Sequence, residues 1–147
     1  AHEIAIAGHR VLLLERAFRI KPCGGAIPPC LLGEFDIARS LLKAEIQSAR
    51  MISPKEQKVD MPIDGTFVGM VDRDEFDPWL RQRAQHAGAE LEIAAFKKLE
   101  YLDSNTIAVT YITKDADTET KTATARCVLG ADGVHSRVAK QGITNYA

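Results

Sequence analysis

Two glycine-containing segments carry the residue types that could bind a nucleotide. The first is Cys23-Gly24-Gly25, within the sequence IKPCGGAIPP, and the second is Gly130-Ala131-Asp132-Gly133, near the end of the chain. Paired glycines let the backbone approach a flat ring or a pyrophosphate, because no side chain blocks the approach. A glycine turn that leads into a helix also presents backbone amides to an anion. Both segments therefore indicate nucleotide contacts, although a tight turn without a ligand would use the same residues.

Three charged side chains follow predicted strands, where they could contact such a ligand. Glu15 follows the apolar run 11–14, and a carboxylate there can accept hydrogen bonds from both hydroxyls of an adenosine ribose. Arg16 could pair with a phosphate or cover an adenine ring. Arg73 follows the strand-like run 67–71, and its guanidinium fork suits a phosphate. Each of the three could equally be an ordinary surface charge.

The cysteines and histidines indicate neither a metal site nor a nucleophilic triad. The chain has three cysteines without a CxxC pair (Cys23, Cys30 and Cys127), so we expect free thiols in a reducing compartment. We interpret Cys23 as a packing residue near the ligand, because no base is adjacent to it. The four histidines lack metal-ligand spacing with cysteines or acids. No catalytic residue is predicted.

Composition excludes several classes of protein. The chain has 147 residues and a formal net charge of −1, from 19 basic and 20 acidic side chains. This balance gives no basic excess for nucleic-acid binding. The longest apolar run is too short to span a bilayer and no signal peptide opens the chain, so we expect a cytoplasmic location. Nothing in the sequence indicates an oligomer.

The apolar patterning predicts a mixed α/β fold. A helix end at 1–8 and a buried strand at 11–14 indicate the middle of a βαβ unit. A helix at 74–87, capped by Asp74 or Asp77, leads through Gly88 into a parallel strand at 89–94. The other predicted elements are a loop at 22–33, a helix at 34–43, short strands at 46–52, 58–61 and 66–71, antiparallel strands at 97–103, 106–113 and 121–129, and a helix beginning within 136–140. The apolar end of the 121–129 run, residues 125–129, could rejoin the parallel sheet.

Together these motifs resemble a known family. LLLER, KPCGGAIP, the arginine before the helix and GADGxxSxVA resemble the flavin-dependent geranylgeranyl reductases of chlorophyll and bacteriochlorophyll synthesis, within the p-hydroxybenzoate-hydroxylase-like class of FAD proteins. RIKPCGGAIPP, ARMISP and FVGMVDR resemble the purple-bacterial subgroup. The likeness covers essentially the whole chain. KPCGGAIP is specific to the reductases, whereas GADGxxS is shared with hydroxylases.

The resemblance implies a truncated Rossmann-like FAD-binding domain, with a three-stranded antiparallel crossover and part of a β-rich substrate domain. The predicted division is a partial FAD-binding domain at 1–44, part of the substrate-domain insertion at 45–72, and the continued FAD-binding domain with a β-meander at 73–147. The implied cofactor contacts are Glu15 at the FAD ribose, Arg16 near the adenosine, Cys23, Gly24 and Gly25 beside the flavin, Arg73 at the pyrophosphate, and Asp132 and Gly133 at FAD and NADPH.

We also expect the sequence to be a fragment that lacks both ends of its family's pattern. In dinucleotide-binding folds the ribose acid lies roughly 20 residues after the first glycine turn, and counting back that far from Glu15 leads before Ala1. The later glycine-aspartate motif and most of the isoprenoid-binding region are also missing. We therefore expect this chain alone to be inactive and to bind FAD weakly or not at all.

The implied activity is the NADPH- and FAD-dependent reduction of a geranylgeranyl group to phytyl, as the free diphosphate or attached to a pigment. Such a lipidic substrate implies peripheral contact with the photosynthetic membrane. One alternative is an FAD-dependent aromatic hydroxylase, which KPCGGAIP disfavours. The other is a cofactor-free interaction domain derived from the same fold, which the missing glycine turn would suit.

Overall fold

The computed structural model describes residues 1–19, 23–114 and 118–143. The chain divides into two compact units, one formed by 1–18 with 84–147 and the other by 19–83. Each unit has its own cluster of buried apolar side chains. The start of the predicted glycine-rich segment (20–22) and the middle of the predicted polar loop at 114–120 lie outside the described residues. The predicted functional domain boundaries stay a prediction.

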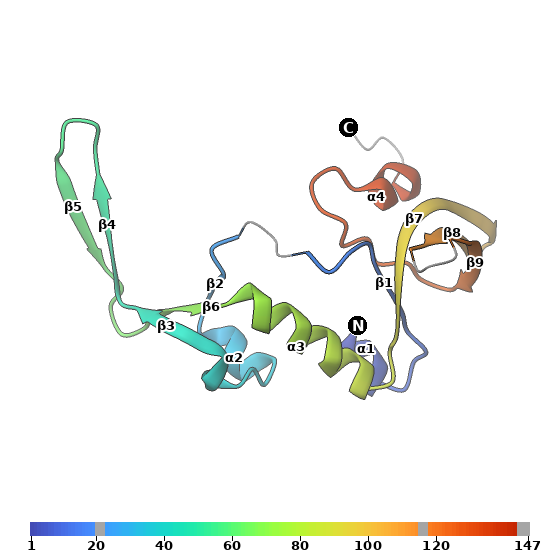
Figure 1. Cartoon of the computed structure of the whole chain (residues 1–147), viewed down its shortest axis with the longest axis horizontal. Coiled ribbons are helices and arrows are strands. Elements are labelled where there is room, and N and C mark those ends of the chain that lie inside the picture. The colour runs from blue at the N-terminus through green and yellow to red at the C-terminus, as the bar shows by residue number, and fades with distance from the viewer. Residues whose placement is uncertain (20–22, 115–117, 144–147) are drawn as a thin grey trace. The chain divides into compact units, whose positions relative to one another are not determined.

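The first unit is built on a four-stranded sheet in the order β1-β7-β8-β9 (Figure 1). Strand β1 (Leu12–Glu15) runs parallel to the start of β7 (Glu90–Asp103). Strands β8 (Thr106–Thr113) and β9 (Thr120–Ala125) continue the sheet antiparallel. The parallel strand after a helix and a glycine is therefore confirmed, as is the three-stranded antiparallel crossover.

Two strands predicted separately, 89–94 and 97–103, are one continuous strand. β7 pairs with β1 at its start and with β8 over the rest of its length, and its register with β8 shifts at 96–98 and again at 101–103. Bulges of this kind bend a strand and increase its twist without ending it. A single strand can therefore leave the parallel sheet and enter the meander.

The last predicted strand is too long. β9 ends at Ala125, and the apolar residues that follow do not rejoin the parallel sheet. Val128 instead lines an apolar hollow with Tyr101 and Ile107 of the meander, and Leu129 is 70% exposed. The prediction that this run rejoins the parallel sheet is therefore wrong, because Val128 packs on side chains of the meander rather than pairing with a neighbouring strand.

Small residues form the core of the first unit near its helices. Helix α1 (His2–Ile6) ends before Gly8, and Gly88 follows helix α3 (Arg73–His86); both glycines have a positive φ, +84° and +96°. This confirms the two glycine stops, because the left-handed conformation costs glycine little. Three buried alanines pack together with the partly buried Val11, Leu13 and Ala87: Ala5, Ala84 and Ala89.

The second unit contains a three-stranded antiparallel sheet and a separate hairpin. Its sheet has the order β2-β6-β3, formed by β2 (Ala26–Ile27), β6 (Val68–Val71) and β3 (Leu42–Ile46). Strands β4 (Ser48–Ile52) and β5 (Lys58–Pro62) pair with each other as the hairpin. The run predicted as one strand at 46–52 is divided at Gln47, because β3 and β4 pair with different strands.

The predictions for residues 22–43 were partly wrong. The predicted loop contains β2 and helix α2 (Cys30–Glu34), and the predicted helix at 34–43 is replaced by a short 3-10 helix (Arg39–Leu41) and the start of β3. Proline is tolerated at a helix start, so Pro29 can lead into α2. Tertiary packing decides the rest: Leu31, Leu32, Leu41 and Leu42 pack around the buried core of Ile37, Val71 and Phe76.

Helix α3 begins one residue earlier than predicted, and its cap is neither of the predicted residues. Asp72 precedes it, and the Asp72 Oδ1 atom accepts a hydrogen bond of 2.9 Å from the Asp74 amide. Pro78 lies inside the helix rather than in a first turn capped by Asp77. The rings of Phe76 and Trp79 stack at 5.9 Å and pack this helix against the second-unit core.

The β4–β5 hairpin is amphipathic. Register and strand alternation place Ala49, Met51, Val59 and Met61 on one face, where Met51, Val59 and Met61 are 60%, 59% and 42% exposed. On the other face, Arg50 Nε donates to Asp60 Oδ1 at 2.6 Å across the strands. The hairpin thus presents a small apolar surface backed by an ion pair.

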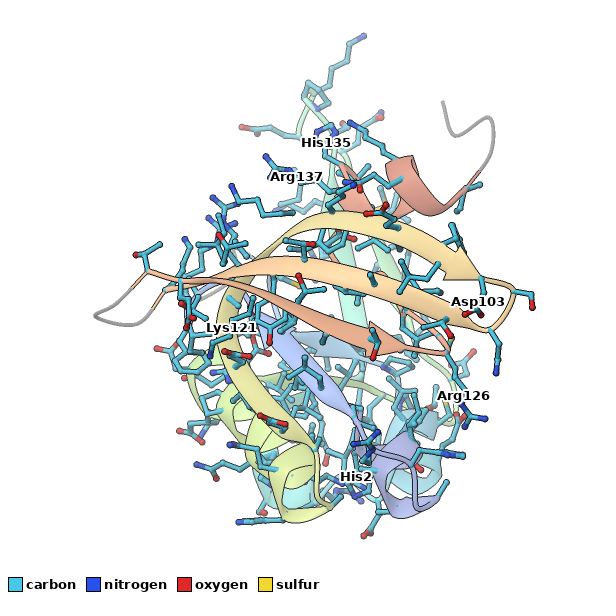
Figure 2. All side chains as sticks on the ribbon, turned by 90° about the vertical axis from the view of Figure 1, so that its right-hand side faces the viewer. His2, Asp103, Lys121, Arg126, His135 and Arg137 are labelled. Carbon is cyan, nitrogen blue, oxygen red and sulfur yellow. The ribbon has the colours of Figure 1, made fainter. Side chains whose placement is uncertain are left out.

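A cross-strand group in the first unit gives a prediction about pH. Lys121 on β9 reaches Glu92 on β7, with Nζ 2.7 Å from Oε1, and Figure 2 labels this lysine on the sheet. Hydrogen bonds from Lys121 and Tyr111 outweigh partial burial and lower the pKa of Glu92. A lowered folded-state pKa contributes stability above the unfolded pKa, which is near 4.3 for glutamate, and this contribution is lost as pH falls through the folded value.

We therefore expect Lys121→Met to flatten the acid side of the stability profile. The variant loses the first cause of the lowered Glu92 pKa, so its free energy of unfolding should fall less steeply between about pH 5 and pH 3. Urea unfolding at a series of pH values measures this slope. Lys55→Met removes an exposed lysine that forms no ion pair with another described residue, and it serves as the control. Equal slopes in wild type and Lys121→Met would contradict the prediction.

Candidate cofactor site

The CGG segment is held against the end of β6. Gly25 has a φ of +69°, and its carbonyl accepts a hydrogen bond of 3.0 Å from the Val71 amide. A Cβ atom on Gly25 would lie 2.2 Å from the Val71 carbonyl oxygen, which is inside any real contact distance. The next residue, Ala26, pairs with Met70 in the sheet. Glycine is therefore required at 25 for both the backbone conformation and the close approach of β6.

Arg73 lies at the start of α3, directly after this contact. Its Nε and Nη2 atoms donate to Asp77 Oδ1 and Oδ2, both at 2.8 Å, and the two side chains are only 21% and 13% exposed. The hydrogen bond with Asp77 raises the pKa of Arg73, and the nearby Cys23 thiol contributes in the same direction. The structure thus brings together the predicted residues Cys23, Gly25 and Arg73.

Gly24 lies between these anchored residues with open space beside it. A Cβ atom there would meet no heavy atom of the described residues within 4 Å. The chain itself therefore gives no steric reason for glycine at 24, whereas a flat ring or a phosphate resting on the backbone would give one. The exposed backbone at Gly24 thus lies near the Arg73 guanidinium and the Cys23 thiol. This combination suits an anionic nucleotide with a planar ring.

In the first unit, the GADG turn is organised by the Asp132 carboxylate. Its Oδ2 atom accepts hydrogen bonds from the Arg137 and Val138 amides at 2.7 and 3.3 Å, and its Oδ1 atom accepts one from the Ser136 hydroxyl. The Ser136 Oγ atom in turn caps helix α4 (Arg137–Gly142) by accepting from the Ala139 amide at 2.9 Å. The predicted helix after GADG is confirmed.

The charge state of Asp132 follows from these contacts. Partial burial raises the pKa of Asp132, but hydrogen bonds from the Ser136 hydroxyl and from the Val138 and Arg137 amides outweigh it and hold the pKa below its ordinary value. The described contacts of Asp132 are those of a residue that holds the turn. Gly133, with φ +90°, has open space beside it, and Figure 2 labels the neighbouring His135 and Arg137 at the start of α4.

Glu15 and Arg16 lie where the sequence predicts them, at the end of β1. Glu15 is the last residue of the strand and pairs with Ile93 of β7. Its side chain is partly exposed and that of Arg16 is exposed, and neither forms a hydrogen bond or ion pair with another described residue. Both belong to the same unit as Asp132 and Gly133, whereas Cys23, Gly24, Gly25 and Arg73 belong to the other. Their convergence on one cofactor stays a prediction.

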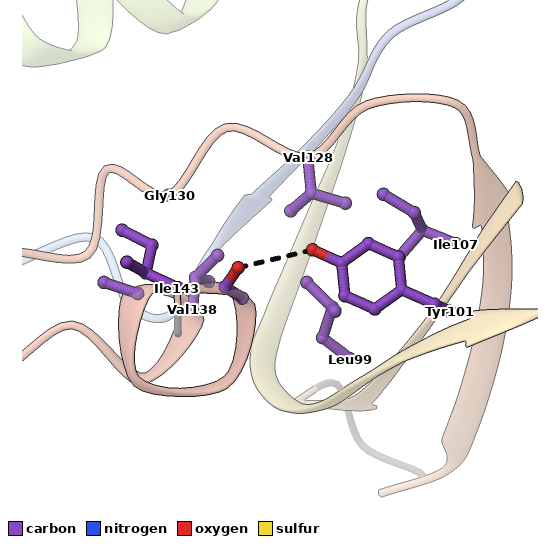
Figure 3. A pocket seen from close by; sticks show the side chains of 9 residues that line it. Leu99, Tyr101, Ile107, Val128, Gly130, Val138 and Ile143 are labelled. Carbon is purple, nitrogen blue, oxygen red and sulfur yellow. Dashed lines mark hydrogen bonds between the residues drawn. The ribbon is translucent and has the colours of Figure 1, made fainter. Parts of the chain in front are cut away.

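A hollow in the first unit is too small to be the flavin pocket. It measures about 170 Å³ and lies between β7, β8, the segment before GADG and α4 (Figure 3). Pockets for drug-sized ligands enclose roughly 300–1,000 Å³. The Tyr101 hydroxyl lies 3.4 Å from the Gly142 carbonyl oxygen across it, and Gln141 binds the backbone of β7 at Lys97 and Leu99. The hollow therefore belongs to the packing of α4 on the meander.

Two residues of these sites were not predicted. Asp77 was considered only as a helix cap, and Ser136 only as a helix start. The spacing of Arg73 and Asp77 is i, i+4, at which opposite charges on a helix meet, so this signal was present in the sequence. The hydrogen bond from the Ser136 hydroxyl to Asp132 depends on the geometry of a turn, and no residue spacing in the sequence predicts it.

Other classes of site find no support in the part of the chain that the structure describes. Residues 1–19, 23–114 and 118–143 contain no group of three or more side chains arranged to hold a metal ion. The three cysteines are all exposed free thiols. Within the same ranges, no helix has the length and apolar character needed to cross a membrane.

The fold and these sites define an FAD-binding protein: residues 33–145 match the FAD binding domain family, and the chain belongs to that family. The chain is 52% identical over 138 residues to geranylgeranyl diphosphate reductase of Rhodobacter capsulatus, covering 94% of this chain and 35% of that protein. It is 37% identical over 153 residues to the chloroplastic geranylgeranyl diphosphate reductase of Oryza sativa, covering 95% and 33%. The predicted resemblance to geranylgeranyl reductases is therefore confirmed.

A solved structure supports the same fold. The chain resembles the geranylgeranyl bacteriochlorophyll reductase-like protein of Thermoplasma acidophilum with a TM-score of 0.65 and 23% identity, over 80% of this chain and 32% of that one. The predicted Rossmann-like FAD-binding fold is confirmed, and the hydroxylase alternative is not favoured by the relatives. The chain spans about a third of the length of the relatives that it matches.

Proposed function

We propose that this chain is part of an FAD-dependent reductase that uses NADPH to hydrogenate carbon–carbon double bonds of a geranylgeranyl group. The observation that carries the proposal is the 52% identity to the R. capsulatus reductase across 94% of this chain. It is supported by the Cys23-Gly24-Gly25 segment, which has the geometry of a backbone platform beside an arginine.

The chain's own residues suit the binding of FAD. When bound, FAD would supply the hydride chemistry that connects NADPH with a double bond. We propose that the Arg73 guanidinium binds the pyrophosphate, while the Glu15 carboxylate accepts hydrogen bonds from the ribose and Arg16 lies near the adenosine. Cys23, Gly24 and Gly25 would lie beside the flavin. Asp132 shapes its turn so that Gly133 and the start of α4 face FAD and NADPH.

The substrate that we propose is isoprenoid, either geranylgeranyl diphosphate or a geranylgeranyl tail on a (bacterio)chlorophyll pigment. The apolar face of the β4–β5 hairpin supports the assignment of residues 45–72 to a β-rich substrate domain, because apolar side chains suit a lipidic ligand. For a substrate of this kind we propose a cytoplasmic protein with peripheral access to the photosynthetic membrane.

The test is a reduction assay with the full-length protein. Purified protein, NADPH and geranylgeranyl diphosphate are incubated without oxygen, and in parallel with a geranylgeranylated pigment, and the products are analysed by mass spectrometry. We expect a gain of two hydrogens for each reduced double bond. Bound flavin together with oxygen insertion into an aromatic substrate would establish a hydroxylase instead. A full-length protein without flavin would establish an interaction domain.

A further inference from the structure

A neighbouring carboxylate, that of Asp77, holds the Arg73 side chain in one orientation. An arginine side chain on a protein surface must lose rotamer entropy before it can hold a ligand. Here a bidentate fork to Asp77 already fixes the guanidinium, with both N–O distances at 2.8 Å. Because Asp77 uses Nε and Nη2, Nη1 is not engaged by this carboxylate, and the Cys23 thiol lies near the same guanidinium. The side chain is therefore oriented before any ligand arrives.

Asp77 itself is held on a rigid support. It lies one turn along α3 from Arg73, between Phe76, which is 8% exposed, and the half-buried Pro78. Phe76 belongs to the second-unit core and stacks on Trp79. The helix that carries this carboxylate is thus packed on the core of its unit, and the carboxylate in turn holds the guanidinium.

We propose that Asp77 is a positioning residue for cofactor binding: it holds the Arg73 guanidinium beside the CGG segment so that its free edge meets the FAD pyrophosphate. This inference rests on the proposed function, because it takes FAD as the ligand of Arg73. Asp77 contacts neither the cofactor nor the substrate in this role. Asp77 reduces the conformational entropy that the Arg73 side chain loses when FAD binds.

A second acid on the same helix provides a matched control. Glu75 receives both carboxylate contacts from Lys43, at 2.8 and 2.7 Å, but that pair is about half exposed. Glu75→Gln and Asp77→Asn remove the same charge from the same helix, and only the second releases Arg73. A general effect of helix charge on FAD binding would appear in both variants, whereas positioning would appear in one.

The experiment measures FAD binding to the full-length apoprotein by quenching of flavin fluorescence. We expect Asp77→Asn to weaken FAD binding about 10-fold, because a charge-assisted contact loses its fixed geometry. Glu75→Gln should leave the dissociation constant within about two-fold, and Asp77→Glu should recover most of the affinity by restoring a carboxylate at i+4. Thermal unfolding of each apoprotein shows whether a variant is folded at the binding temperature.

Several results would overturn the positioning role. FAD binding that is unchanged or tighter in Asp77→Asn would show that the carboxylate is neutral or competes with the phosphate for Arg73. An equal loss in Glu75→Gln would assign the effect to charge alone, and no recovery in Asp77→Glu would also contradict it. Failure of the proposed function is seen in the wild-type protein alone. That protein would then bind no FAD, or would bind FAD without reducing a geranylgeranyl group, before any variant is compared.

Discussion

Gly25→Ala is expected to destabilise the second unit by ~3 kcal/mol, because it combines backbone strain with an impossible contact. The φ of +69° disfavours any residue with a Cβ atom, and that atom would lie 2.2 Å from the Val71 carbonyl oxygen. The segment would have to move off β6, which would break the hydrogen bond between the Gly25 carbonyl and the Val71 amide. Urea unfolding followed through the fluorescence of Trp79, the single tryptophan of the chain, measures the loss.

Gly24→Ala is the matched control for this prediction. A Cβ atom at 24 meets no atom of the described residues within 4 Å, so we expect a change in the free energy of unfolding within about 0.5 kcal/mol. In the full-length protein the same variant should weaken FAD binding, since the added methyl group takes the space proposed for the cofactor. Similar unfolding losses for the two alanine variants would contradict the requirement for glycine at 25.

Asp132→Ala is expected to unfold the first turn of α4. The carboxylate accepts hydrogen bonds from two backbone amides and from Ser136, which itself caps the helix. Removing such a cap costs about 1–2 kcal/mol, so hydrogen exchange at the Arg137 and Val138 amides should accelerate roughly 5- to 30-fold. Because the folded-state pKa of Asp132 is lowered, the protection in wild type is present above about pH 3.9 and is lost as pH falls through the folded value.

The control for Asp132→Ala is a substitution that keeps both the Asp132 carboxylate and the backbone amides that donate to it. Arg137→Ala removes an exposed side chain but leaves the backbone N–H that Asp132 binds. We expect exchange at residues 137 and 138 to stay within about two-fold of wild type, in the range of an ordinary surface substitution. Fast exchange in this variant, or slow exchange in Asp132→Ala, would show that the carboxylate does not organise the turn.

Local sequence patterns were sufficient to predict an element of secondary structure where that element has one strong signal. The helix at 73–86 combines an apolar face with a glycine stop, and the parallel strand after it follows from the same pattern. Residues 30–46 lack such a signal. Their leucines suit a helix by propensity, but packing on Ile37, Val71 and Phe76 divides them into a short helix, a 3-10 turn and a strand.

The candidate site shows the same division between local and long-range information. Side-chain chemistry, glycine spacing and the family resemblance predicted the cofactor contacts without coordinates, and those contacts stay predictions. The sequence did not identify Asp77 as the partner of Arg73, or the Gly25 carbonyl as the partner of the Val71 amide. The second contact joins residues that are 46 positions apart, and no periodicity encodes a pairing over that distance.

The amino-acid sequence by itself determined the family of this chain and its FAD-binding class, and it supplied the residues proposed for the cofactor site, because glycine corners and charged strand ends have direct physical requirements. Only the tertiary structure decided which of those residues meet. It placed Cys23 and Gly25 beside Arg73, committed Asp132 to the start of α4, and fixed the arginine through Asp77. Such contacts depend on which surfaces pack together, and packing is a property of the whole chain rather than of any one segment.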